Sequence, residues 1–413
     1  MLFFAIETGI FILVLFGLVW ANLRFGKIFV VYGDFLAQWA TLRVYVTQGI
    51  QPYSPDAWSA AVRLLPGLAQ TQSFQGAPLF HQPFYALVLI LPFALLPDPF
   101  LAQAVWMVIL EVSLVFTVIS AVNSVQWKIR LPDWFELLVF ALLGMYSFSA
   151  LVSGNIGIVS ALLGVGALAA LRSERDELAG LALALATVQP EMLILLTVLI
   201  LMWSASHRRF KVWLWFFAGL FFLVGIGLLF YFQWPGEYLH TLVKYANQIP
   251  LTTPAASFRA WWPGVGIPLG WLFSGFFALL LLGEWIQVRS KDFRWFLWTA
   301  CLTLVVGQWL GIPTTIENFI ILLLPLVLVL GTLDQRVAQS AAWFVPGVLL
   351  VLFVGLWWLF FQTLAGGSAS DLKSSFLFPL PFILLVGLYW VRWWCVRPAR
   401  LYVEELKEYE TRR

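Results

Sequence analysis

Five polar residues near the N-terminus have the spacing of a single helix face. Asp34, Gln38, Thr41, Tyr45 and Gln48 follow one another at intervals of 4, 3, 4 and 3 residues, which places them in one row along a helix. Asp34 heads the row directly after a glycine, so it could cap the helix. A carboxylate in surroundings of low polarity could also act as a general base. The two interpretations are compatible.

Leucine, tryptophan and valine side chains occupy the other faces of this helix. The pattern predicts an amphipathic helix in the plane of the membrane interface, with its polar row facing an outer chamber. Gly49 should end the helix, and Pro52 prevents its resumption.

The composition of the chain predicts the kind of fold that positions these residues. Hydrophobic residues make up 62% of the 413 residues and charged residues only 11%, which predicts an all-α polytopic membrane protein. No series of alternating strands suggests a β-barrel. The net charge of +3 does not suggest a nucleic-acid partner. Cys301 and Cys395 lie in apolar runs, so we expect neither a disulfide framework nor a thiolate metal site.

Apolar runs predict about twelve transmembrane helices. The run from Leu178 to Trp203 is interrupted by Gln189-Pro190-Glu191, so it either crosses once or re-enters. The predicted spans are Thr8–Leu23, Gln82–Leu96, Phe100–Val122, Trp134–Val152, Ile156–Leu171, Leu178–Trp203, Val212–Phe232, Val265–Val288, Trp295–Leu310, Ile316–Gly331, Ala341–Phe361 and Phe376–Trp394.

Basic loops predict the orientation. The segments "SHRRFK" (206–211) and "RSKDFR" (289–294) and the C-terminal tail carry clustered cations, which the positive-inside rule places in the cytoplasm. We therefore expect one transmembrane domain over residues 1–395 and a cytoplasmic tail over 396–413. Its outer loops are 24–81 and 233–264, and no signal peptide is expected to be removed. The protein should be an integral multi-pass protein of a prokaryotic plasma membrane, with its active site facing outside.

Several short motifs follow one another over roughly residues 30 to 330. The first are "GDF" with the helix after it, "GIQPYS" (49–54) and "FHQPFYALVLILPFALLP" (80–97). The later ones are "SGNIGIVSALLGVGALAAL" (153–171), "AGLALALATVQPEMLIL" (179–195) and "IPTTIENFIILLLPLVL" (312–328). In this order the motifs resemble those of glycosyltransferase family 87. Membrane members of this family transfer mannose from polyprenyl-phosphate mannose, so the resemblance implies a GT-C-like fold and a hexosyltransferase.

The resemblance also implies roles for single residues. Asp34 is the expected catalytic base. The expected substrate-binding residues are Gln38, Tyr45, Tyr53, His81, Gln82, Asn155, Gln189, Glu317 and Asn318. Three motifs depart from the family form: His81-Gln82-Pro83 replaces Tyr-x-Pro-Pro, Gln189-Pro190 replaces Lys-Pro, and Glu317-Asn318 stands where a histidine is common. Without that lysine, the donor phosphate should be held differently.

A lipid-linked donor is also favoured on physical grounds. No glycine-rich phosphate motif follows a strand, and no loop is long enough for a nucleotide-binding domain. A polyprenyl-phosphate sugar arrives from the membrane, and its phosphate leaves without protonation, so one carboxylate can suffice, with inversion. The expected partners are this donor, a lipid or glycolipid acceptor and membrane lipids.

Cations and metal ligands are sparse in the predicted outer loops. The cations available there for the donor phosphate are Arg43, Arg63, His81, Lys244 and Arg259, and His81 is the best placed. No ligand spacing predicts a metal site, although a divalent cation between Asp34 and the donor phosphate remains an option.

Two other classes of protein stay open at this point. A transporter or flippase would account for the spans, for Glu111 in mid-span and for the broken helix at Gln189-Pro190. It would not account for the long first loop with an acidic residue at its head. A scaffold protein predicts no polar row at all. The sequence does not name the sugar or the acceptor.

Overall fold

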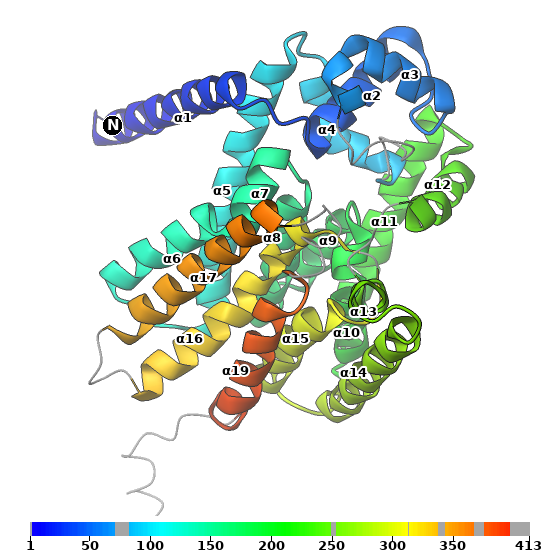
Figure 1. Cartoon of the computed structure of the whole chain (residues 1–413). Helices are drawn as coiled ribbons and strands as arrows, with labels where there is room; N and C mark the ends of the chain where they lie inside the picture. The colour runs from blue at the N-terminus through cyan, green and yellow to red at the C-terminus, as the bar shows by residue number, and fades with distance from the viewer. Residues whose placement is uncertain are drawn as a thin grey trace, which may run out of the picture.

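The protein is all-helical in the computed structural model, which describes residues 2–70, 82–248, 253–312, 314–337, 343–366 and 376–396. No β-strand occurs in these residues, which confirms the predicted all-α class (Figure 1). The α-helices are α1 (Leu2–Ile28), α2 (Asp34–Gln48), α3 (Pro55–Leu64), α4 (Leu87–Ala94), α5 (Pro99–Val125), α6 (Leu131–Leu143), α7 (Met145–Ser153), α8 (Gly157–Arg172), α9 (Asp176–Ala186), α10 (Pro190–Ser206), α11 (Phe210–Phe230), α12 (Trp234–Gln248), α13 (Pro254–Trp261), α14 (Gly266–Val288), α15 (Phe293–Gly307), α16 (Leu323–Val337), α17 (Phe344–Gly366) and α19 (Pro379–Val396). The 3₁₀ helices are η1 (Pro66–Gln70), η3 (Phe84–Ala86) and η4 (Ile316–Leu322).

Six of the described helices are long and apolar enough to cross a membrane, or seven if the bent pair α6 and α7 is one span. The six are α5, α11, α14, η4 with α16, α17 and α19. Shorter apolar helices, α8, α10 and α15, pack among them. The chain is therefore a multi-pass membrane protein, and the number twelve stays a prediction.

One predicted span is wrong. Residues 82–96 form only η3 and the eight-residue α4, which contains Pro92. Eight helical residues cover about 12 Å, far less than the ~30 Å hydrocarbon core. The apolar character of this segment instead serves contacts with α2 and α5.

The interrupted run at Leu178–Trp203 is a helical hairpin. Helix α9 ends at Ala186 and α10 begins at Pro190. Asp176 at the start of α9 and Trp203 near the end of α10 line the same cavity. The chain therefore leaves that end of the bundle in α9 and returns to it in α10, and its tip at residues 187–189 lies deeper in the protein.

Helix α2 has the predicted bounds but a different environment. It begins at Asp34 and ends at Gly49, whose φ of 71° and N–H bond to the Tyr45 carbonyl form a left-handed C-cap. However, every residue from Phe35 to Leu42 is buried, and Gln38 and Thr41 are 1% and 0% exposed. The expected exposure of the polar row to an outer chamber is therefore wrong at Gln38 and Thr41. The placement of the helix in the plane of the membrane interface stays a prediction. Figure 1 shows α2, α3 and α4 gathered at one end of the molecule.

Two side chains of α2 fix it against the end of α4. The Trp39 indole N–H donates to the Phe93 carbonyl at 2.9 Å. The Arg43 guanidinium donates to the carbonyls of Ala94 and Leu95 at 3.0 and 2.9 Å. Helix ends leave such carbonyls without intrahelical partners, so Arg43 stabilises a helix end. From the sequence, Arg43 was a candidate contact for the donor phosphate; in the structure its guanidinium binds these two carbonyls instead.

The start of α2 lies directly on the turn between α7 and α8. A Cβ atom on Gly33 would lie 2.5 Å from the backbone of Ser153. Gly154 has a φ of +72°, and a Cβ there would lie 2.4 Å from Cβ of Phe35. Only glycine at both positions lets the two backbones approach this closely, and this approach positions Asp34.

This contact predicts a specific loss of stability in Gly154→Ala. A left-handed alanine costs about 1–2 kcal/mol, and the overlap with Phe35 adds to it. We expect the apparent melting midpoint in detergent to fall by about 4 °C or more. Gly166→Ala on α8 is the control, because a Cβ there meets nothing within 4 Å. Equal midpoints for the two variants would contradict the proposed packing.

Candidate active site

A hydrogen bond between two distant segments defines the site. Asn155 Nδ2 donates to Asp34 Oδ2 at 2.8 Å. The amide oxygen of Asn155 accepts the Gly157 N–H at 2.6 Å, and this second bond fixes which way the amide is turned. Asp34 is the first residue of α2, and the N-cap position before it is Gly33 rather than Asp34. The Asp34 carboxylate accepts from the α7–α8 turn through Asn155.

The tip of the α9–α10 hairpin adjoins the same turn through Asn318 of η4. Gln189 Nε2 donates to Asn318 Oδ1 at 3.1 Å, and Asn318 Nδ2 donates to the Thr314 hydroxyl at 3.3 Å. A Cβ on Gly157 would lie 2.5 Å from Oδ1 of Asn155 and 2.7 Å from Oδ1 of Asn318. The two amide networks thus meet at Gly157.

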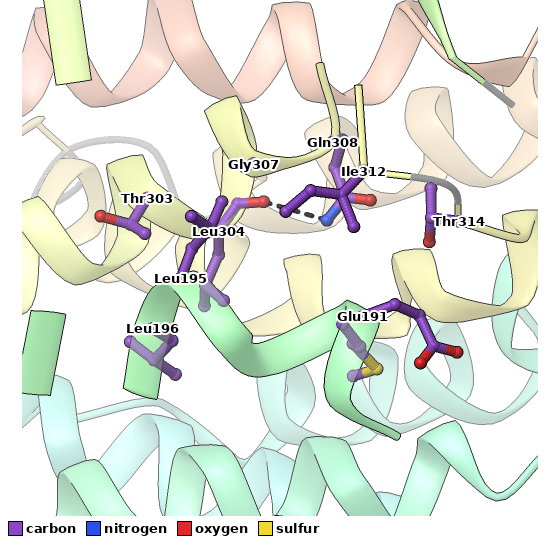
Figure 2. A pocket seen from close by; sticks show the side chains of 10 residues that line it. Glu191, Leu195, Leu196, Thr303, Leu304, Gly307, Gln308, Ile312 and Thr314 are labelled. Atoms are coloured by element: carbon purple, nitrogen blue, oxygen red, sulfur yellow. Dashed lines mark hydrogen bonds between the residues drawn. The ribbon is translucent and has the colours of Figure 1, made fainter. Parts of the chain in front are cut away.

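Glu191 adds a second carboxylate at the hairpin tip. It lies close enough to Asp34 for the two charges to repel each other, and it interacts with the side chain of Gln189. Four separate segments therefore contribute to one polar cluster, which consists of Asp34, Asn155, Gln189, Glu191 and Asn318. Figure 2 shows Glu191 and Thr314 at one end of a neighbouring cavity whose other end is lined by Leu196 and Thr303.

Aromatic residues cover the hairpin tip. The Tyr85 hydroxyl donates to the Thr187 carbonyl at 3.1 Å and lies 3.0 Å from the Thr187 hydroxyl. Burial, followed by the neighbouring Glu191 carboxylate, raises the pKa of the Tyr238 hydroxyl well above its usual value. The Tyr238 ring lies 6.3 Å from that of Tyr53, whose hydroxyl donates to the Gln82 carbonyl at 2.7 Å. Burial likewise raises the pKa of Tyr53, so both phenols stay protonated donors.

Several buried polar atoms around the cluster have no partner among the described residues. They include Gln38 Nε2, one turn after Asp34, Gln189 Oε1 and the Tyr238 hydroxyl. Buried polar groups normally have hydrogen-bond partners, so water or substrate hydroxyls would complete these. The cavity in Figure 2 holds only about 10 Å³, roughly one water molecule.

The structure gathers some of the predicted substrate-binding residues and separates others. Asn155, Gln189 and Asn318 belong to the cluster, and Glu317 lies at its edge, where its Oε1 accepts from Ser149 at 3.2 Å. Tyr53 is one of the aromatic residues that cover the hairpin tip, and the Gln82 carbonyl accepts a hydrogen bond from its hydroxyl. Tyr45 lies farther along α2 against the Phe84 ring at 5.6 Å. His81 lies outside the described residues.

Two further residues were harder to find from the sequence. Tyr85 sits in the "FHQPFYA" motif, but its partner Thr187 is 102 positions away. Tyr238 belongs to α12, a helix without a family motif. Glu111 is not part of the cluster: its carboxylate accepts from Asn22 at 3.0 Å between α1 and α5.

Metal ligation receives limited support. Within the described ranges, no three His, Cys, Asp or Glu side chains are grouped as ligands. Asp34 and Glu191 would supply two carboxylates, the ligand type that Mg²⁺ accepts. A divalent cation shared with the donor phosphate stays a prediction.

Comparison with known families identifies the chain. The sequence model of glycosyltransferase family 87 matches residues 80–313, more than half of the chain. The chain belongs to glycosyltransferase family 87. This confirms the resemblance read from the motifs, and it makes the protein a membrane glycosyltransferase. Asn155 and Gln189 lie inside the matched range, whereas Asp34 and Asn318 lie outside it. Neither the curated proteins nor the solved structures gave a match.

The Asp34–Asn155 bond predicts a change of pH dependence in Asn155→Asp. Two adjacent carboxylates share a proton, which raises the pKa of the pair above the ~4 of an isolated aspartate. The acid limb of the activity profile should move up by about one pH unit or more. Stability should fall relative to the parent as pH rises through the raised pKa, because only the protonated pair is tolerated in the folded state.

Transfer rates and thermal melts between pH 5 and pH 9 measure both effects. Asn123→Asp, at an exposed position of α5, is the control and should leave the profile unchanged. Coincident profiles for Asn155→Asp and the parent would show that Asn155 does not govern the ionisation of Asp34.

Proposed function

We propose that the protein transfers a hexose, preferably mannose, from a polyprenyl-phosphate donor to a hydroxyl group of a lipid or glycolipid acceptor. The observation that carries this proposal is the 2.8 Å bond from Asn155 to Asp34. It holds a carboxylate in a fixed orientation within a cluster of amides and hydroxyls, as a general base requires. The match to family 87 supports the reaction class.

The proposed reaction is a single displacement. Asp34 accepts the proton of the acceptor hydroxyl while that oxygen attacks the anomeric carbon. The bond between this carbon and the phosphate oxygen breaks, and polyprenyl phosphate leaves with the electron pair. Attack opposite the leaving group inverts the anomeric centre. Asp34 then releases its proton to water.

The polar cluster suits a sugar in this reaction. Gln38 Nε2 and the Tyr238 hydroxyl can donate to sugar hydroxyls, and Gln189 Oε1 can accept from one. Tyr53 adds an aromatic ring of the kind that packs against sugar faces. Trp234, whose ring lies 5.6 Å from that of Tyr85, adds another. His81, the last residue of the predicted outer loop 24–81 that also contains Asp34, is the proposed contact for the donor phosphate. A transporter or flippase would need none of this fixed geometry around Asp34, and family membership favours the transferase.

The decisive variant is Asp34→Asn. It keeps the size of the side chain while removing the base, so transfer from a polyprenyl-phosphate sugar to membrane lipid acceptors should fall by at least ~100-fold. The melting midpoint should stay close to that of the parent. Asp98→Asn is the matched control: Asp98 caps α5 through its contacts with the N–H groups of Phe100 and Leu101, which asparagine can retain. A stable Asp34→Asn protein with near-parental transfer would refute the role of base.

We also propose that the Asp34 site faces the outside of the cell. The basic loops lie at the opposite end of the bundle, and the positive-inside rule assigns that end to the cytoplasm. In a background lacking Cys301 and Cys395, Ser59→Cys on α3 should react with an impermeant maleimide in intact cells. Ser290→Cys, in the turn between α14 and α15, should react only after permeabilisation. The reverse pattern would invert the orientation; both positions are exposed.

A further inference from the structure

A large cavity lies at the end of the bundle remote from Asp34. Its volume is about 980 Å³, at the upper end of the range for small-ligand sites. Helices α8 and α10 begin beside the polar cluster and end at this cavity, about 25 Å farther along. Its cationic lining residues are Arg172, Arg208, Arg209, Lys211 and Arg294, against three carboxylates.

Two of these cations already have acidic partners. Arg209 pairs with Asp176 and donates to the Leu171 carbonyl at 2.9 Å. Lys211 pairs with Glu177 at 2.9 Å. The other cationic side chains of the lining are Arg172, Arg208 and Arg294, and its other carboxylates are Glu174 and Asp292.

Arg172 is the most constrained of them. Its guanidinium donates to the Ser124 carbonyl and lies 5.6 Å from the Phe293 ring centre. No carboxylate pairs with it in the part of the chain that the structure describes. A guanidinium has five N–H donors, so the hydrogen bond to Ser124 leaves most of them for another acceptor.

Arg172 and Arg294 face a common space. Both line the large cavity and also a narrower one of about 140 Å³ beside it. Their positive charges repel each other. The positive-inside rule requires cations at this end of the bundle, but it does not require two of them to share one cavity. An anion with several oxygens beside Arg172 would relieve the repulsion and accept the remaining donors of Arg172.

Backbone strain gathers around the same cavity. Among the described residues, Gln126, Glu174 and Arg208 are the non-glycine residues with positive φ, at 59°, 58° and 58°. All three line this cavity, at the ends of α5, α8 and α10. A left-handed conformation costs a non-glycine residue about 1–2 kcal/mol, and residues in such conformations cluster at ligand sites.

We propose that this cavity binds the phosphate group of an anionic ligand at the end of the protein opposite the Asp34 site. Two sources carry this group: the headgroup of an anionic phospholipid and a soluble phosphate. The proposal does not depend on the transfer reaction, because it rests on residues that take no part in that reaction.

Binding can be measured on the purified full-length protein without an activity assay. In the first arm, delipidated protein in detergent is titrated with inorganic phosphate against chloride at equal ionic strength, and melting midpoints give an apparent Kd. In the second arm, nanodiscs of phosphatidylcholine alone are compared with nanodiscs that contain increasing fractions of phosphatidylglycerol.

The variants are Arg172→Gln and Arg294→Gln, with Arg289→Gln as the matched control. Arg289 is an exposed arginine at the same end of the bundle that does not line the cavity. Each cavity variant removes charge-assisted hydrogen bonds, so its apparent affinity should be at least ~10-fold weaker. The control should match the parent. If Arg172→Gln does not fold, the exposed Arg294 still provides the test.

Each outcome is decisive. Stabilisation by phosphatidylglycerol alone identifies a lipid headgroup, stabilisation by phosphate alone identifies a soluble ligand, and stabilisation by both identifies a phosphate site open to either. The proposal is overturned if neither stabilises the parent. It is also overturned if Arg294→Gln responds as Arg289→Gln does, since the effect would then be general charge screening.

Discussion

The backbone contact between Gly33 and the Ser153–Gly154 turn is the constraint on which the site depends. The two glycines let residues about 120 positions apart approach so closely that a single Cβ on either side would overlap the other chain. The consequence is immediate in both segments: Asp34 follows one glycine and Asn155 the other, and their side chains meet at 2.8 Å. Burial of α2 and the capping of α4 by Trp39 and Arg43 hold one side of this contact in place.

The α9–α10 hairpin supplies the opposite wall of the site. The break before Pro190 ends α9 and starts α10 at this depth, and it places Gln189 against Asn318 and Glu191 near Asp34. Non-helical backbone inside a membrane protein needs partners for its polar groups. The Tyr85 hydroxyl provides one for the Thr187 carbonyl. The aromatic cover therefore makes the break tolerable as well as enclosing the site.

The sequence predicted the helices better than their environments. The spacing and Gly49 gave the bounds of α2, because both are local signals. The burial of α2 could not be predicted, because the surfaces that cover it come from elements distant in the sequence. In addition, the Thr41 hydroxyl can be buried without an outside partner, because it donates to the Ala37 carbonyl within the helix. Hydropathy also misread residues 82–96, because it counts apolar residues without regard to Pro92. The motifs named most of the cluster, whereas the Tyr85 and Tyr238 contacts depend on tertiary structure alone.

The hydrogen bond from the Asn155 amide to Asp34 suits the role of base that we propose for this carboxylate. A general base must be ionised before reaction and must still accept a proton during it. The Asn155 N–H group stabilises the ionised form and fixes its direction. In the proposed reaction, the amide of Asn155 therefore sets the geometry of the base.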